Sequence, residues 1–202
     1  MTPARLESFS DNVLAFAATL LVLSIAVPPL TSKEGLAGAL GHEWPSFVAY
    51  VVSFSTIGII WINHHATVRR LKAVDHTVHV LNLALLMTVV ILPFTTALMA
   101  AYLKSRDGEH LAAAIYAGSF LLMAVTFQVM QRVVMLGRGH LVTGELSNAE
   151  RRAFVNRSAR GIPLYLLATV IAVVSAYATL TLCGLLAAFY ALPRTTADGL
   201  GG

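Results

Sequence analysis

Residues 5–23 read RLESFSDNVLAFAATLLVL, a polar segment followed directly by an apolar one. The apolar run extends from Asn12 to Val27. A bilayer core about 30 Å thick takes roughly 20 apolar residues as a helix, because lipid offers the backbone no hydrogen-bond partner and a helix satisfies its own. We therefore predict a membrane-spanning helix that carries polar residues at its beginning.

Four further apolar runs follow along the chain, at 44–62, 80–102, 111–136 and 162–192. The last holds 31 residues, which is too long for one straight span and short for two. Small and polar residues at 175–177 interrupt its Leu- and Val-rich composition, so we predict a tight turn there between two short helices. The prediction is an all-α integral membrane protein with six transmembrane helices per subunit; a single crossing by the last run would give five.

The composition supports this class. Hydrophobic residues make up 57% of the chain and charged residues 12%, whereas soluble domains are about half apolar and about a quarter charged. The low charge also excludes intrinsic disorder. Cys183 is the sole cysteine, which excludes an intrachain disulfide and a Cys-based zinc site. The sequence contains neither a phosphate-binding Gly-rich loop in a strand context nor a Gly-x-Ser-x-Gly motif, so we do not expect an enzyme.

The basic residues fall mostly on one side of the predicted spans. Ten lie in segments on the side of Arg5, and three, Lys33, Lys104 and Arg106, lie on the other side. With an even number of spans, Arg194 joins the first group. Because Lys- and Arg-rich loops stay cytoplasmic, we predict cytoplasmic N- and C-termini. This asymmetry also explains the net charge of +4 without nucleic acid as a partner.

We treat residues 1–202 as one six-helix unit. It comprises helices 1–4 in 1–136, a cytoplasmic linker at 137–161, helices 5 and 6 in 162–192, and a flexible tail at 193–202. Within the linker, Ser147 and Glu150 have the spacing of a capping box that opens a helix. Arginines flank Phe154 and Val155, which suits either a helix against the anionic inner leaflet or a solvated basic loop.

The polar residues at the start of the first run allow two interpretations. Ser8, Ser10, Asp11 and Asn12 are all residue types that cap helix N-termini. Alternatively, Arg5 and Asp11 bridge to neighbouring helices near the membrane surface, because ionisable residues at membrane depth face the bundle interior.

Three segments resemble the transmembrane protein 175 family, the endosomal and lysosomal potassium channels and their bacterial homologues. The first is Arg5 with Phe9-Ser10-Asp11 and the run Thr19–Leu23; the others are Trp61-Ile62-Asn63-His64-His65, and Asn82-Leu83 with Pro93-Phe94-Thr95. The resemblance covers the first three spans. It implies a potassium-selective channel without a Thr-Val-Gly-Tyr-Gly filter, and this chain also lacks that motif.

The family's single-repeat members are bacterial homotetramers. The resemblance therefore implies a homotetramer around a closed axis in a bacterial plasma (inner) membrane, with the pore lined by the first helix. Its partners are the lipid bilayer and its own copies. Potassium is the permeant ion, and no cofactor or resident metal is implied.

The resemblance places the family's three constriction positions on Phe16, Leu20 and Leu23, and its selectivity-related threonine on Thr19. Helical spacing puts these residues on one face, with Asn12 one turn earlier. Four copies would stack apolar rings with one hydroxyl ring, and such constrictions gate by dewetting. Since potassium holds its water less tightly than sodium, an apolar ring would hinder sodium more. Phe16 departs from the isoleucine that the family carries at its narrowest point, which leaves Phe16 or Leu23 as the gate.

The resemblance also implies a structural role for Arg5, Phe9, Ser10 and Asp11, which bind neighbouring helices at the cytoplasmic end. The residues implied to support this motif are Trp61, His64, His65 and Asn82. Adjacent histidines on a helix point about 100° apart, so His64 and His65 cannot share a metal.

Two other histidines have i, i+3 spacing, His76 and His79, next to Asp75. We favour a polar helix start there over a metal site, and we expect no metal site in the chain. A membrane enzyme that uses these two histidines is the least favoured function.

The main alternative function is a proton-coupled secondary transporter that uses Asp11, Arg5 and the histidines as a relay. It predicts charged groups near the middle of the membrane and inverted repeats. The charges here cluster at the ends of the runs instead, so we favour the channel.

Overall fold

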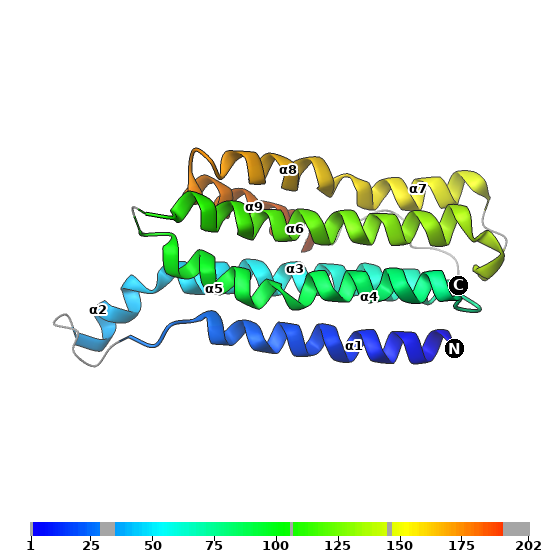
Figure 1. The fold of residues 1–202 in the computed structure, drawn as a ribbon, viewed down its shortest axis with the longest axis horizontal. Coiled ribbons are helices and arrows are strands. Elements are labelled where there is room, and N and C mark those ends of the chain that lie inside the picture. The colour runs from blue at the N-terminus through cyan, green and yellow to red at the C-terminus, as the bar shows by residue number, and fades with distance from the viewer. Residues whose placement is uncertain (1, 29–34, 106, 145–146, 192–202) are drawn as a thin grey trace, which may run out of the picture.

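The apolar runs form long helices that lie side by side along one axis of the molecule (Figure 1). The computed structural model describes residues 2–28, 35–105, 107–144 and 147–191. In these ranges the regular structure is helical except for one isolated β-bridge between Leu71 and Val142. The all-α prediction is confirmed for this part of the chain.

Four helical segments are long and apolar enough to cross a bilayer, namely Pro3–Ser24, Trp44–Val68, His76–Tyr102 and Glu109–Gly137. They correspond to the first four predicted spans.

The first helix, α1 (Pro3–Leu20), begins nine residues earlier than its apolar run. Thr2 is extended and Pro3 has the fixed φ of a first helical residue, so the polar segment is helical too. Ser10 and Asp11 therefore lie well inside α1, and their interpretation as N-cap residues is wrong. The helix tightens into a 3₁₀ turn at Leu21–Ser24 and ends where Ile25 becomes extended.

The second and third spans lie next to α1. A short helix, α2 (Gly35–His42), precedes α3 (Trp44–Val68). The third apolar run forms α4 (His76–Val90) and α5 (Leu92–Tyr102). Pro93 is in the first turn of α5, where its missing N–H costs no helix hydrogen bond. The third apolar run is therefore divided just before Pro93.

The centre of the bundle is α6 (Glu109–Arg132), which packs against α4, α5, α8 and α9. It carries the fully buried rings of Tyr116 and Phe120, whose centroids are 4.7 Å apart. A π turn at Val133–Gly137 and a 3₁₀ turn at Gly139–Leu141 follow it.

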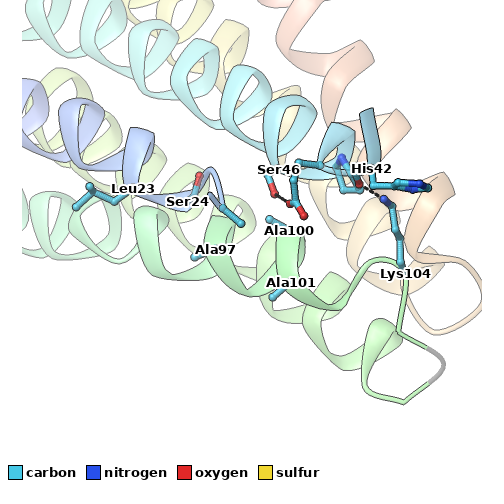
Figure 2. A pocket seen from close by; sticks show the side chains of 11 residues that line it. Leu23, Ser24, His42, Ser46, Ala97, Ala100, Ala101 and Lys104 are labelled. Carbon is cyan, nitrogen blue, oxygen red and sulfur yellow. Dashed lines mark hydrogen bonds between the residues drawn. The ribbon is translucent and has the colours of Figure 1, made fainter. Parts of the chain in front are cut away.

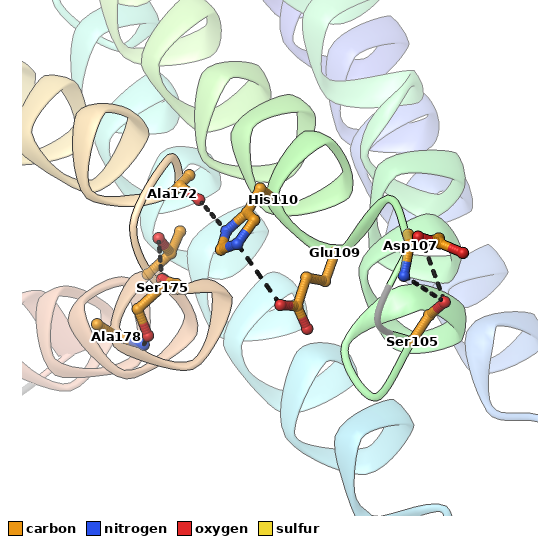
Figure 3. A network of polar contacts seen from close by, with 8 residues as sticks. Ser105, Asp107, Glu109, His110, Ala172, Ser175 and Ala178 are labelled. Carbon is orange, nitrogen blue, oxygen red and sulfur yellow. Dashed lines mark hydrogen bonds and ion pairs between the residues drawn. The ribbon is translucent and has the colours of Figure 1, made fainter.

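The last apolar run is broken into α8 (Gly161–Ile171) and α9 (Ala176–Ala191), which pack against each other. The break at 172–175 is close to the predicted one, and Figure 3 shows what holds it: His110 Nδ1, on the first turn of α6, is 2.9 Å from the Ala172 carbonyl oxygen. His110 Nε2 is 3.5 Å from Glu109 Oε1. Ser175 Oγ accepts the Ala178 N–H at 3.2 Å. The predicted flexible tail, 193–202, lies outside the described residues.

The linker contains α7 (Asn148–Ala159), which extends the line of α8 alongside α6 (Figure 1). Its capping box, with Ser147 and Glu150, is confirmed. Because residues 148–159 are helical, the solvated loop is wrong, whereas a helix against the anionic inner leaflet stays a prediction. The helix α7 lies alongside α6 (Figure 1). The reason is polar packing: Gln128 Nε2 donates to the Val155 carbonyl at 3.1 Å, and Ser158 Oγ donates to Gln128 Oε1 at 2.7 Å.

Candidate functional site

The helix α1 lies at the edge of the bundle (Figure 1) and packs against α3 and α4. Its buried side chains lie on one face and are Leu6, Ser10, Leu14 and Ala17. The opposite face has no neighbour within the described protomer.

That opposite face is a stripe with alternating spacings of four and three residues. Its members, all exposed, are Arg5, Phe9, Asn12, Phe16, Thr19 and Leu23. Phe16 is 64% exposed and Leu23 is 76% exposed, so large apolar side chains point away from the protomer. A spacing of 3.5 residues is the pattern by which helices meet along a continuous seam. We call this set the α1 stripe.

Four of the five predicted pore residues belong to the α1 stripe; the exception is Leu20, which is half-buried. Leu20 lies at the border of the stripe, between buried Ala17 and Leu21. Helical spacing from Phe16 places both Leu20 and Leu23 on the same face, so the sequence alone did not distinguish which of them is exposed.

Thr19 is the one hydroxyl-bearing residue of the stripe. Its Oγ1 donates to the Phe16 carbonyl oxygen at 2.8 Å. The proton is thereby directed along the helix, and the oxygen lone pairs remain free to accept or to coordinate.

A buried polar cluster fixes the other face of α1 to its neighbours. Asn82 Nδ2 on α4 donates to Ser10 Oγ at 3.0 Å, and His64 Nε2 on α3 is 2.8 Å from Asn82 Oδ1. All three side chains have no exposed surface. Ser10 Oγ is also 2.8 Å from the Leu6 carbonyl oxygen. We call these three residues the polar anchor, because they connect α1, α3 and α4.

More exposed contacts join α1 to α3 beside the polar anchor. Trp61 Nε1 donates to Asp11 Oδ1 at 2.9 Å, and His65 Nδ1 is 2.6 Å from Glu7 Oε1. Sequence reasoning missed Glu7, although its spacing of four residues from Asp11 places both on one helix face.

Arg5 does not join this network in the protomer. Its side chain is on the exposed stripe, and among the residues that the structure describes none pairs with it. Phe9 is likewise exposed, at 48%. The family resemblance implies that Arg5 binds a neighbouring helix. Within the protomer it does not, because Arg5, like Phe9, lies on the α1 stripe rather than on the face toward α3.

Asp75, His76 and His79 form a polar helix start at the beginning of α4, as predicted. Asp75 is its N-cap and accepts the Val78 N–H at 2.9 Å. The Arg138 guanidinium pairs with the Asp75 carboxylate and donates to Thr77 Oγ1 at 2.7 Å. His79 Nδ1 is 2.9 Å from the Asp75 carbonyl oxygen, so this ring is directed at the backbone.

A cavity of about 400 Å³ lies at the far end of α1 from the polar anchor (Figure 2). It is lined by Leu23 and Ser24 together with residues of α3, α5 and the segments next to them. Ser46 Oγ donates to Glu43 Oε2 at 3.1 Å, and Lys104 Nζ donates to the His42 carbonyl. The α1 stripe thus ends beside an open, partly polar cavity.

Most charged residues in the four candidate spans lie toward the span ends, and Asp11 lies farther inside, in the middle of α1. The charged residues are Arg5, Glu7, Asp11, Glu109 and Arg132. The buried polar groups farther along are neutral, for example Ser53, whose Oγ is 2.8 Å from Thr96 Oγ1 and 3.1 Å from Tyr116 OH. Such hydroxyl contacts join helices in lipid without an ionisable group.

Known proteins resemble this chain over most of its length. The family model described as "Endosomal/lysosomal potassium channel TMEM175" matches residues 5–93. A potassium channel from Streptomyces collinus is 43% identical over 186 residues, which is 92% of this chain and 90% of that protein. A potassium channel from Chamaesiphon minutus is 36% identical over 190 residues, covering 93% of each. The crystal structure of a lysosomal potassium-selective channel TMEM175 homologue from Chamaesiphon minutus superimposes with a TM-score of 0.84 at 35% identity, over 96% of this chain and 98% of that one.

Proposed function

Because the chain belongs to the TMEM175 family, we propose that it is the subunit of a bacterial potassium channel. Its relatives from Streptomyces collinus and Chamaesiphon minutus are named potassium channels and match nearly its full length. In this proposal four copies assemble around a closed rotational axis in the plasma membrane and conduct potassium passively, without a cofactor.

The observation that carries the proposal is the α1 stripe. Phe16 and Leu23 are more than half exposed in the protomer, although α1 is anchored on its other face by buried hydrogen bonds. A seam spaced by 3.5 residues suits helices that meet around an axis. Four α1 helices arranged in this way would surround a narrow apolar path.

Selectivity then follows from dehydration rather than from a carbonyl filter. Rings of Phe16 and Leu23, with Leu20 at the border, would exclude water when closed and force an ion to shed hydration when open. Thr19 adds the one hydroxyl oxygen of the stripe, and its bond to the Phe16 carbonyl leaves lone pairs free for the ion. Such a path hinders sodium more than potassium.

The proposed topology has six spans. The fifth is α8 and the sixth is the 16-residue apolar helix α9, whereas the basic helix α7 belongs to the cytoplasmic linker before α8. The N-terminus and C-terminus are cytoplasmic, on the side with most Lys and Arg residues. The polar anchor lies toward that end and fixes α1 while its stripe lines the pore.

A proton-coupled transporter is less well supported. Asp11, Arg5 and the histidines would have to form a relay into the membrane, but Arg5 is exposed on the α1 stripe. His79 is directed at the backbone at the start of α4. The middle of the second, third and fourth candidate spans holds hydroxyl groups rather than charged side chains.

Bilayer recording of the purified protein tests the proposal. With potassium and sodium chloride on both sides, potassium in excess on one side and sodium in excess on the other, we expect a reversal potential close to the potassium equilibrium value. A value near zero would reject selectivity, and the absence of current from a correctly assembled protein would reject the channel. Native mass spectrometry of the same sample gives the number of subunits.

A further inference from the structure

Three potential metal ligands gather outside the polar anchor, toward the N-terminal end of α1. They are Glu7 and Asp11 on α1 and His65 on α3, and one ligand atom of each lies within 4.8 Å of the others. The His65 side chain is 38% exposed and that of Glu7 23%, so solution can reach the group. We call these three residues the α1–α3 triad.

The contact between His65 and Glu7 is incomplete as a hydrogen bond. His65 Nδ1 is shielded from solvent and 2.6 Å from Glu7 Oε1, yet the two are not aligned as donor and acceptor. A ring nitrogen and a carboxylate oxygen that face each other in this way repel unless a proton or a cation lies between them.

Trp61 orients two of the three ligands, Asp11 and His65. Trp61 Nε1 donates to Asp11 Oδ1 at 2.9 Å, which leaves the second carboxylate oxygen available. The Trp61 ring is also 6.1 Å from the His65 ring, one helical turn away on α3. Outer partners that hold ligating carboxylates and imidazoles in place are typical of metal sites.

We propose that the α1–α3 triad binds a divalent transition metal of the zinc type. One imidazole nitrogen and two carboxylate oxygens form a donor set for zinc, with water in the fourth position. Zinc bonds of about 2.0–2.2 Å place tetrahedral ligand atoms roughly 3.4 Å apart. The three ligand atoms lie within 4.8 Å of one another, so binding requires side-chain rotation to close the remaining distance. Magnesium, which prefers six oxygen ligands in strict octahedral geometry, fits poorly.

A bound metal would tie α1 to α3. Glu7 and Asp11 belong to one helix and His65 to another, so the ion adds a cross-link beside the polar anchor. This inference does not rest on the proposed channel function, because it concerns binding and helix attachment, which are measured without current. The site is not predictable from the sequence, since Glu7 and His65 are 58 positions apart.

The experiment measures zinc bound to the full-length protein, purified in detergent with a tag that contains no histidine. We expect about one zinc per chain after gel filtration, by elemental analysis, and a melting temperature that rises with zinc until the site saturates. Magnesium at the same concentrations leaves the melting temperature unchanged. Competition with a chromogenic chelator gives the affinity.

Matched variants assign the site. His65→Gln and Glu7→Gln keep the side-chain volume and abolish the stoichiometric zinc. His76→Gln removes an exposed histidine outside the triad and binds as the wild type does. Trp61→Phe keeps all three ligands and weakens zinc binding by about ten- to a hundredfold.

Two results would overturn the proposal. If the wild type takes up no zinc, the triad is not a metal site. If His65→Gln or Glu7→Gln binds zinc as tightly as the wild type, the metal is bound elsewhere. Should one variant fail to fold, the other decides, because each removes a different ligand from a different helix.

Discussion

Asn82 on α4 bonds to Ser10 on α1, with Nδ2 3.0 Å from Oγ, across 72 positions of sequence. The same amide presents its oxygen to His64 Nε2 at 2.8 Å. Because an amide oxygen can only accept, the His64 ring carries a proton on Nε2. One side chain thus satisfies partners on two other helices, in a place with no exposed surface.

Asn82→Ala should therefore lower stability markedly. The substitution leaves the Ser10 hydroxyl and the His64 ring without their interhelical partner, and an unsatisfied buried polar group costs about 1–3 kcal/mol. We expect a lower melting temperature in detergent. The control is Asn63→Ala, since Asn63 Nδ2 donates only to the Ile59 carbonyl of its own helix, at 2.8 Å. Equal melting temperatures for the two variants would contradict a special role for Asn82.

The capping box of α7 should respond to pH. The Ser147 backbone N–H and hydroxyl each donate to Glu150 Oε2 at 2.8 Å, and these bonds hold the pKa of the Glu150 carboxyl below its usual value. Because the pKa is lowered on folding, the ionised Glu150 carboxylate stabilises the fold. This stabilisation is fully present above the unfolded-state pKa of about 4.3 and is lost as the pH falls through the folded-state pKa.

Hydrogen exchange measures this effect. Protection of the first turn of α7, corrected for intrinsic exchange rates, should hold from neutral pH down to about pH 4.3 and fall below it. Glu150→Gln keeps a side-chain acceptor but does not titrate in this range, so its first turn should show a smaller change. The same pH response in both proteins would mean that another group is responsible.

Local features of the fold were predictable because each depends on neighbouring residues. Pro93 interrupts the third span, since a proline restricts the backbone before it wherever it occurs. Ser147 and Glu150 are three positions apart and cap one turn. The break in the last run falls next to the small and polar residues at 175–177.

Features that depend on the rotation and pairing of whole helices were not predictable. Leu20 and Leu23 are similar in the sequence, yet packing against α3 and α4 covers one and exposes the other. Arg5 lies away from the polar anchor because α1 already includes it, and five residues of helix place it about 140° from Ser10 around the axis. The position of α7 depends on Gln128, a buried polar residue whose partner is 27 positions away.

Thr19→Val should reduce selectivity while leaving the fold intact. Valine has nearly the shape of threonine but no oxygen, and the Thr19 hydroxyl is bonded only within its own helix. The loss of an oxygen contact worth about 0.5–1.5 kcal/mol changes a permeability ratio roughly two- to tenfold. We expect the potassium-to-sodium ratio from reversal potentials to fall. Thr181→Val is the control, because Thr181 is also exposed and donates to the Tyr177 carbonyl at 2.9 Å, but on α9. An unchanged ratio for Thr19→Val would exclude this hydroxyl from the ion path.

Leu23→Asn tests whether the α1 stripe faces the ion path or the lipid. Leu23 is 76% exposed in the protomer, and Met87 on α4 is exposed to the same extent. A polar side chain at either position has a similar cost in lipid, so Met87→Asn controls for effects on folding and insertion. A ring of four amides at position 23 would wet an apolar constriction; if it lowers the barrier by about 1.4 kcal/mol, the potassium current rises about tenfold. We expect this rise for Leu23→Asn and wild-type current for Met87→Asn, in bilayers with equal amounts of protein. If the two variants behave alike, Leu23 contacts lipid and the pore is lined by another helix.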